Sequence, residues 1–256
     1  KGGTKLNHFY TIRLNRKKII LTDDIILTIA ILIGTQTSSI VAMFTKDEPA
    51  ALSKGNEDVE DVAITFNISW GEEKVESILE VLEKEDVQAT FFVSGEWAER
   101  HPDLLEEISE GTHEIGLLGY RYKSYLDQEP EQIRKDLIKA QEVMEKLGYE
   151  DVQLLRTPHG HLNEEIIELA ESMHFQVVHW NVNPDDWENP GVESIIDEVM
   201  EQTENGDIIL LHASDSAKQT AEALETVLPG LKNKGYGLIT ISEKVNQAKA
   251  DTELID

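Results

Sequence analysis

The chain of 256 residues combines a strong negative charge with a complete lack of cysteine. It has 23 Lys and Arg against 50 Asp and Glu, which gives a formal net charge of −27, and 40% of its residues are hydrophobic. This hydrophobic share can build a core, so the chain is not a disordered acidic polymer. The lack of Cys excludes disulfides, thiolate nucleophiles and Cys-ligated metal sites. The charge argues against a nucleic-acid partner, because proteins neutralise the phosphate backbone with Lys and Arg.

The charge is divided unevenly along the chain. Residues 1–24 hold six basic and two acidic residues, a net +4, whereas residues 45–256 hold 17 basic and 48 acidic residues, a net −31. Residues 25–44 carry no charge and would span about 30 Å as a helix, the thickness of a bilayer core. This pattern predicts a single-pass anchor in the cell membrane, with a basic cytoplasmic segment and an extracytoplasmic acidic domain. A cleaved signal peptide and a buried apolar helix are the alternatives.

After a polar linker at residues 45–61, short apolar runs alternate with amphipathic stretches through residues 62–243. Strands are expected at 62–68, 89–93, 114–118, 152–155, 177–182, 207–212 and 238–241, and helices at 74–84, 102–110, 130–147, 164–173, 192–203 and 220–231. The alternation predicts parallel strands joined by crossover helices, in an open sheet or a barrel. Neither G-x-G-x-x-G nor G-K-[ST] is present, which argues against nucleotide-binding open sheets. Residues 244–256 are expected to be an acidic C-terminal tail.

The segments that follow the strands are the places to look for function, since a parallel barrel carries its functional groups there. They read T-F-N-I-S at 65–69, H-E-I-G-L-L-G-Y-R-Y at 113–122, R-T-P-H-G at 156–160, N-P-D-D-W at 183–187 and I-L-L-H at 209–212. In order and spacing they resemble the five motifs of the NodB-type polysaccharide deacetylases, carbohydrate esterase family four. This resemblance implies a distorted parallel barrel of about seven strands over residues 62–243 and a divalent metal such as zinc.

Further segments resemble the PdaB-type sporulation proteins of endospore-forming bacteria. They are N-H-F-Y at 7–10, the single apolar segment, S-K-G at 53–55 and S-W-G at 69–71. This similarity implies a role in sporulation or in cell-wall peptidoglycan metabolism, with cell-wall glycan as the partner.

The motifs that supply the base and the metal in the family are altered here. The resemblance places Asn67 at the position of the general-base Asp, and an amide has no lone pair that is basic at neutral pH. It places Ile68, Leu118 and Tyr122 at the positions of the metal ligands, and these residues are not a zinc ligand set. We therefore expect no metal ligands among the family positions, although the apolar residue at 68 is also typical of the PdaB-type subgroup.

The remaining motifs are kept. By resemblance, His212 is the general acid, Asp186 belongs to the same site, and Arg156 would orient the base and here faces Asn67. The expected substrate-binding residues are Pro158, Trp187, Leu211, Tyr122 and Trp70. Trp70 could stack on a sugar ring or could equally cover the core.

The family reaction needs an acid, a base and a metal-activated water. Loss of a general base alone costs about 10²–10⁴-fold in rate, so the leading hypothesis is a catalytically impaired deacetylase-fold protein that keeps a glycan-binding groove. The first alternative is an active hydrolase that removes N-acetyl groups through a rebuilt site with His212 and Asp186. Such a site could use metal-binding side chains near the strand ends or His212 without a metal; the candidates are Glu72, Glu73, His159, His161, Asp185 and His212. A purely structural role in the spore is the second alternative.

Overall fold

The computed structural model of the chain describes residues 50–253. The segments expected to be cytoplasmic and membrane-spanning, 1–24 and 25–44, lie outside this range. Within the described range, no helix has the length and apolar character needed to cross a bilayer.

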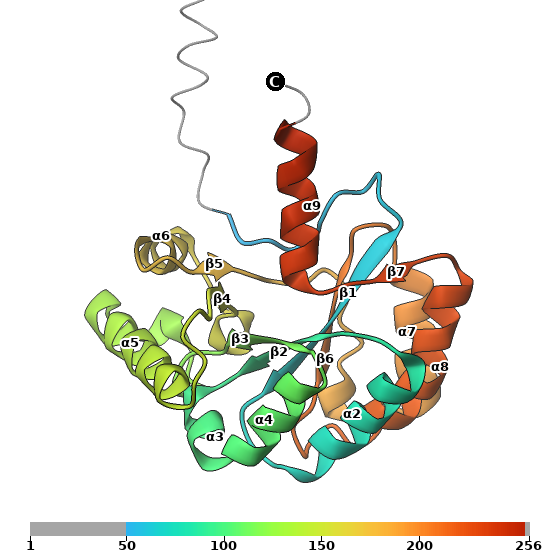
Figure 1. Ribbon diagram of the computed structural model, residues 1–256, viewed down its shortest axis with the longest axis horizontal. Helices are drawn as coiled ribbons and strands as arrows, with labels where there is room; N and C mark the ends of the chain where they lie inside the picture. Colours follow the sequence, from blue (N-terminus) through green and yellow to red (C-terminus); the bar gives the residue numbers. More distant parts are fainter. Residues whose placement is uncertain (1–49, 254–256) are drawn as a thin grey trace, which may run out of the picture. The chain divides into compact units, whose positions relative to one another are not determined.

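The described chain forms a parallel sheet that curves into a half-barrel (Figure 1). Its strands are β1 (Asp61–Ile68), β2 (Thr90–Val93), β3 (Glu114–Leu117), β4 (Leu154–Leu155), β5 (Gln176–Val177), β6 (Ile208–His212) and β7 (Gly237–Leu238). The order is β5-β4-β3-β2-β1-β6, and β7 pairs with the start of β1. All strand pairs are parallel, as the alternating sequence pattern predicts. After β5, the chain turns toward the opposite edge of the sheet, where Val182 bridges Ile209 of β6.

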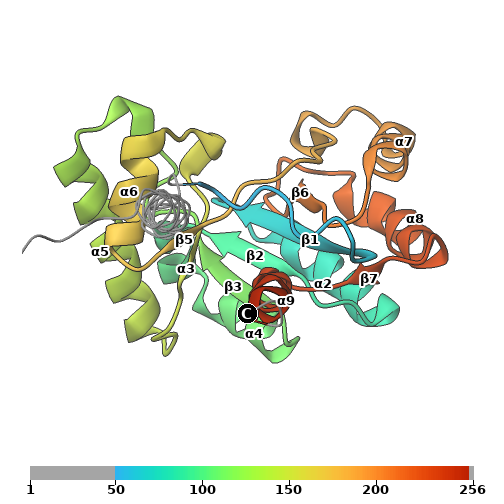
Figure 2. The same ribbon diagram turned by 90° about the horizontal axis from the view of Figure 1, so that it is seen from above.

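The helices cover the outside of the sheet. They are α2 (Glu73–Glu85), α3 (Gly95–Arg100), α4 (Pro102–Glu110), α5 (Pro130–Lys146), α6 (Glu164–Ser172), α7 (Val192–Gln202) and α8 (Thr220–Asn233). The last helix, α9 (Ile241–Glu253), extends away from the sheet near the start of β1 (Figure 1). Figure 2 shows α5 and α6 at one side of the sheet and α7 and α8 at the other, with α2 and α4 between them. Each amphipathic helix buries its apolar face; in α2 this face consists of Val75, Ile78, Val81 and Leu82.

Helix starts follow the local sequence signals. The side chain of Asn163 accepts a hydrogen bond from the backbone N–H of Ile166, so it caps α6, as asparagine commonly does at this position. Helix α5 begins with Pro130, and Glu129 and Gln132 form a capping box around that start. These caps fix where each helix begins and therefore where the loop before it ends.

The domain extends beyond the expected limits at both ends. In the expected linker, the backbone N–H of Leu52 donates to the carbonyl of Val177, and that of Gly55 donates to the carbonyl of Gly206. These backbone contacts involve no apolar run, so hydrophobic periodicity could not reveal them. The expected tail also differs, because residues 241–253 form helix α9. Lys244 of α9 is buried and pairs with the buried Asp61 of β1, which attaches the helix to the sheet.

Candidate active site

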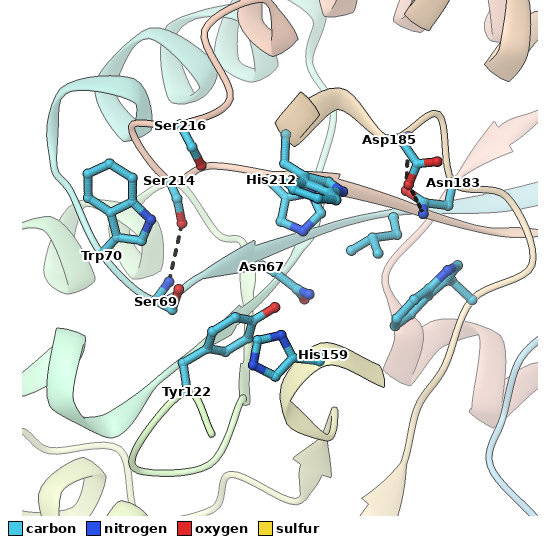
Figure 3. A pocket seen from close by; sticks show the side chains of 13 residues that line it. Asn67, Ser69, Trp70, Tyr122, His159, Asn183, Asp185, His212, Ser214 and Ser216 are labelled. Carbon is cyan, nitrogen blue, oxygen red and sulfur yellow. Dashed lines mark hydrogen bonds between the residues drawn. The ribbon is translucent and has the colours of Figure 1, made fainter. Parts of the chain in front are cut away.

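A pocket of about 410 Å³ opens at the carboxyl ends of the strands (Figure 3). It is lined by Asn67, Ser69, Trp70, Tyr122, His159, Trp180, Asn183, Asp185, Trp187, Leu210, His212, Ser214 and Ser216. Its volume falls within the usual range for small-molecule sites, about 300–1,000 Å³. The pocket therefore lies where a parallel barrel is expected to carry its functional groups.

His212 is held by a buried carboxylate behind the pocket. Oδ1 of Asp186 lies 2.8 Å from Nδ1 of His212, and Oδ2 accepts hydrogen bonds from the His212 backbone N–H at 2.8 Å and from Oγ1 of Thr220 at 2.6 Å. Because the carboxylate can only accept, Nδ1 of His212 must carry the hydrogen. This contact fixes the ring tautomer and leaves Nε2 available to the pocket.

Arg156 is completely buried beneath the pocket. Its Nη1 donates to Oδ1 of Asn67 at 3.1 Å and to Oγ1 of Thr65 at 2.9 Å, and its Nη2 donates to the carbonyl of His179 at 3.1 Å. Its guanidinium carbon lies 4.1 Å from the ring centroid of Phe92, a cation–π distance. Among the described residues, no carboxylate lies within ion-pair distance, and Asp186 does not pair with it.

The charge of Arg156 is thus balanced by neutral oxygens and aromatic rings. Burial lowers the pKa of Arg156 from 12.5 to about 9, and interaction with Tyr122 opposes this shift. The guanidinium still carries its charge at neutral pH. In this chain, an amide oxygen occupies the place where the family would set a carboxylate against the arginine.

The side chains at the family metal positions do not fit a zinc ion. Ile68 and Leu118 are fully buried in the hydrophobic core and have no donor atom. Burial raises the pKa of Tyr122, although the backbone of His159 and the charge of Arg156 act in the opposite direction. Tyr122 is therefore a neutral phenol at neutral pH, and its ring centroid lies 4.2 Å from that of His159.

The side chains considered for a rebuilt metal site have separate partners. Glu72 lies 3.3 Å from Nδ1 of His101, Asp185 accepts from Nδ2 of Asn183 at 2.7 Å, and Nδ1 of His161 lies 3.0 Å from Oγ of Ser124. Across residues 50–253, no three His, Asp or Glu side chains gather in a way that could hold a metal ion.

Three of the five expected substrate-binding residues line the pocket. They are Trp70 and Trp187, of which 54% and 47% of the surface is exposed, and Tyr122. Leu211 and Pro158 are buried and do not line it. Successive side chains of a strand point to opposite faces, so Leu210 shares the pocket face with His212, and Leu211 faces the core under the helices. This alternation was the signal that could have identified Leu210.

Other pocket residues were not among the expected substrate-binding residues. His159, named above as a candidate for a rebuilt metal site, is exposed and lines the pocket, and its backbone has a positive φ of 60°. Its pKa is lowered by partial burial and by His161. The serines Ser69, Ser214 and Ser216 add hydroxyl groups beside Trp70. Ser69 belongs to the segments at 65–69 and 69–71 but was given no role, and Ser214 and Ser216 lie just beyond the segment that ends at His212.

The parallel half-barrel, with these segments in this order at its strand ends, defines the fold and motif arrangement of the NodB-type polysaccharide deacetylase family. A family model described as polysaccharide deacetylase matches residues 54–178. Over 187 residues, the chain is 34% identical to a peptidoglycan-N-acetylglucosamine deacetylase of Bacillus cereus, which covers 71% of this chain and 86% of the relative. The chain belongs to the polysaccharide deacetylase family, carbohydrate esterase family four.

Two further similarities bear on function. The chain is 31% identical over 202 residues to the uncharacterized protein YlxY of Bacillus subtilis, covering 79% of this chain and only 62% of YlxY. Among solved structures, it resembles wild-type BA3943 of Bacillus anthracis, described as a pseudoenzyme of the same family, with a TM-score of 0.72 and 30% identity. That match covers 76% of this chain and 68% of BA3943. A mutant of BA3943 is described as having restored enzymatic activity.

Proposed function

We propose that this chain is a catalytically impaired member of its family that binds N-acetylated cell-wall glycan and does not hydrolyse it at the family rate. The contact between Arg156 and Asn67 is the observation that carries this proposal. The amide oxygen of Asn67 accepts the hydrogen bond that would orient a base, but the amide cannot take a proton from water at neutral pH.

The side chains at the metal positions support the same proposal. Two buried aliphatic residues and a neutral phenol supply no ligand set, and zinc binding needs three or four nitrogen, oxygen or sulfur ligands. Without a metal, the pocket has no group that would lower the pKa of the attacking water or polarise the acetyl carbonyl. The loss of base and metal together would reduce turnover to near background.

The pocket keeps features suited to binding a sugar. Trp70 and Trp187 present large exposed aromatic surfaces at its walls, and three serines offer hydroxyl groups. Exposed aromatic side chains around a concave, partly polar surface are typical of a binding site. The relatives include peptidoglycan deacetylases, which makes peptidoglycan the first ligand to test.

The cellular setting is part of the proposal. The uncharged segment at residues 25–44, between a basic and an acidic part, suits a membrane anchor that places the domain against the cell wall. The similarity to PdaB-type proteins suggests sporulation as the process. Fusion of a reporter to each end of the chain, followed by protease accessibility in intact cells, tests the orientation.

An active hydrolase is the second candidate, because the Asp186–His212 pair is intact. The two candidates differ in acetate production. We would incubate the purified chain with N-acetylated peptidoglycan, with and without added zinc, and measure both released acetate and sedimentation with the glycan. Binding without acetate release is expected for the impaired protein. Acetate release that depends on His212 would favour the hydrolase.

A further inference from the structure

We propose that the pocket recognises the acetylation state of a glycan: it binds an N-acetylated hexosamine and rejects the same sugar with a free amine. This inference rests on the proposed function and specifies its ligand. It follows from the hydrogen-bonding direction of two groups, Asn67 and His212, which lie side by side at the ends of the paired strands β1 and β6.

Asn67 presents a donor to the pocket. Its Oδ1 accepts from Arg156, so the other end of its amide is the NH₂ group. Asn67 is only 3% exposed, and Nδ2 has no protein partner among the described residues. In that part of the chain, the fully enclosed side-chain atoms without a hydrogen bond are Oδ2 of Asp61 and Oγ1 of Thr157. Nδ2 of Asn67 is not one of them, so it is open to the pocket that it lines.

His212 presents an acceptor to the same space. Its Nδ1 donates to Asp186, so the free Nε2 of the neutral ring can only accept. Figure 3 shows Asn67 between His212 on one side and Tyr122 and His159 on the other. The pocket thus offers an N–H donor and a nitrogen acceptor on neighbouring walls.

An acetamido group matches this pair. Its carbonyl oxygen can accept from Nδ2 of Asn67, and its N–H can donate to Nε2 of His212. In an active site of this family, a carboxylate at position 67 would accept instead. The change to an amide therefore removes the base and at the same place creates a donor for the intact acetyl group.

A free amino group does not match it. A protonated amine has three donors and no acceptor, so Nδ2 of Asn67 would lose its partner when the sugar displaces water. The positive charge of Arg156, behind Asn67 and without a carboxylate in contact, would repel the ammonium. Asp185 is the acidic residue in the pocket lining; it is exposed to solvent and already bonded to Asn183, which weakens its attraction.

The test compares two ligands of equal length, the pentamer of N-acetylglucosamine and the pentamer of glucosamine, by calorimetric titration of the full chain. We expect the acetylated pentamer to bind at least about tenfold more tightly, the factor that follows from one unpaired buried donor. Equal affinity would overturn the acetyl recognition and leave glycan binding intact. If neither pentamer binds, both proposals fail. Acetate in the same samples reports separately on hydrolysis.

Asn67→Asp is the informative variant, since it restores an acceptor and gives Arg156 a carboxylate. We expect it to lose the preference for the acetylated pentamer by about tenfold or more. Asn233→Asp, at the exposed end of α8, makes the same charge change away from the pocket and should keep the preference. Thermal unfolding of both variants shows that they are folded. If Asn67→Asp keeps the full preference, Asn67 does not select the acetyl group.

Discussion

Nη1 of Arg156 donates a 3.1 Å hydrogen bond to Oδ1 of Asn67, and this contact joins a fully buried cation to a neutral amide at the carboxyl end of β1. A buried charge is costly unless it is paired. The chain keeps this arginine although the carboxylate that would pair with it in the family is replaced by the amide of Asn67. The consequence can be measured in stability as well as in binding.

Asn67→Asp should stabilise the protein. The carboxylate would accept the existing hydrogen bond from Arg156 and pair with its charge, and a hydrogen bond between charged groups is worth about 1.5–3 kcal/mol. We expect the free energy of unfolding in urea at pH 7 to rise by about 1–3 kcal/mol. Asn233→Asp should change it little. A destabilised Asn67→Asp protein would mean that burial of the new carboxylate outweighs the pairing.

Histidines at the former ligand positions should create a metal site. Leu118 and Tyr122 belong to the same inner cluster, whereas Ile68 packs under the helices, so the first two positions are the ones to change. His159, whose ring centroid lies 4.2 Å from that of Tyr122, would be the third ligand. We expect zinc to raise the melting temperature of Leu118→His/Tyr122→His and not that of the unaltered protein.

Addition of Asn67→Asp to this double variant should restore hydrolysis. The triple variant then has a base as well as the metal site of the double variant, and we expect it to release acetate at least about 10²-fold faster than the double variant. Asn67→Asp alone should release none above background. Acetate release by Asn67→Asp alone would show that hydrolysis in this pocket does not need a rebuilt metal site.

Helix α9 should depend on the buried pair of Lys244 and Asp61. Loss of one partner from a buried pair costs about 3–5 kcal/mol, so Lys244→Met should lower the free energy of unfolding by that order. Lys135→Met breaks an exposed pair with Glu131 on α5 and should cost at most about 1 kcal/mol. Equal losses in urea titrations of the two variants would contradict the role of Lys244.

Stability should fall as the pH drops below 6.5 in part because of His113. Burial lowers the pKa of His113 in the folded state below its ordinary value of 6.5. Between the two pKa values, the unfolded chain binds the proton and the folded chain does not, so stability is present above pH 6.5 and is lost as the pH falls toward the lower pKa. His113→Gln should show a smaller loss between pH 7.5 and 5.5. If the free energy of unfolding falls with pH in the same way for both proteins, His113 is not a source of the pH dependence.

Much of the fold could be predicted because local patterns decide it. After Asp61, strand β1 is an apolar run apart from Thr65 and Asn67, and Asn163 marks a helix start. Helix α9 could not be predicted in the same way. Its apolar face is weak, and a lysine, such as the Lys244 that attaches it to the sheet, normally indicates solvent exposure. The partner of that lysine, Asp61, lies 183 residues away in the sequence.

The candidate site divides in a similar way. The motifs place Asn67, Asp186 and His212 at strand ends, and the structure brings Asn67 and His212 to one pocket. The alternation of side chains along β6 would have been enough to identify Leu210, and not Leu211, as the residue that lines the pocket. A comparison of motifs does not take the direction of the side chains into account. The motifs also predicted that Arg156 faces Asn67, which the structure shows. The positive φ of His159 and the cation–π contact of Arg156 with Phe92 depend on tertiary packing and leave no sequence signal.

Binding of N-acetylated glycan without the family reaction is the property that we propose for this chain. Its most direct test measures metal content and acetate in one sample of the purified chain, incubated with zinc and N-acetylated peptidoglycan. We expect glycan binding, zinc well below one ion per chain after dialysis, and acetate no higher than in a glycan blank. One zinc per chain together with acetate release that a chelator abolishes would contradict it.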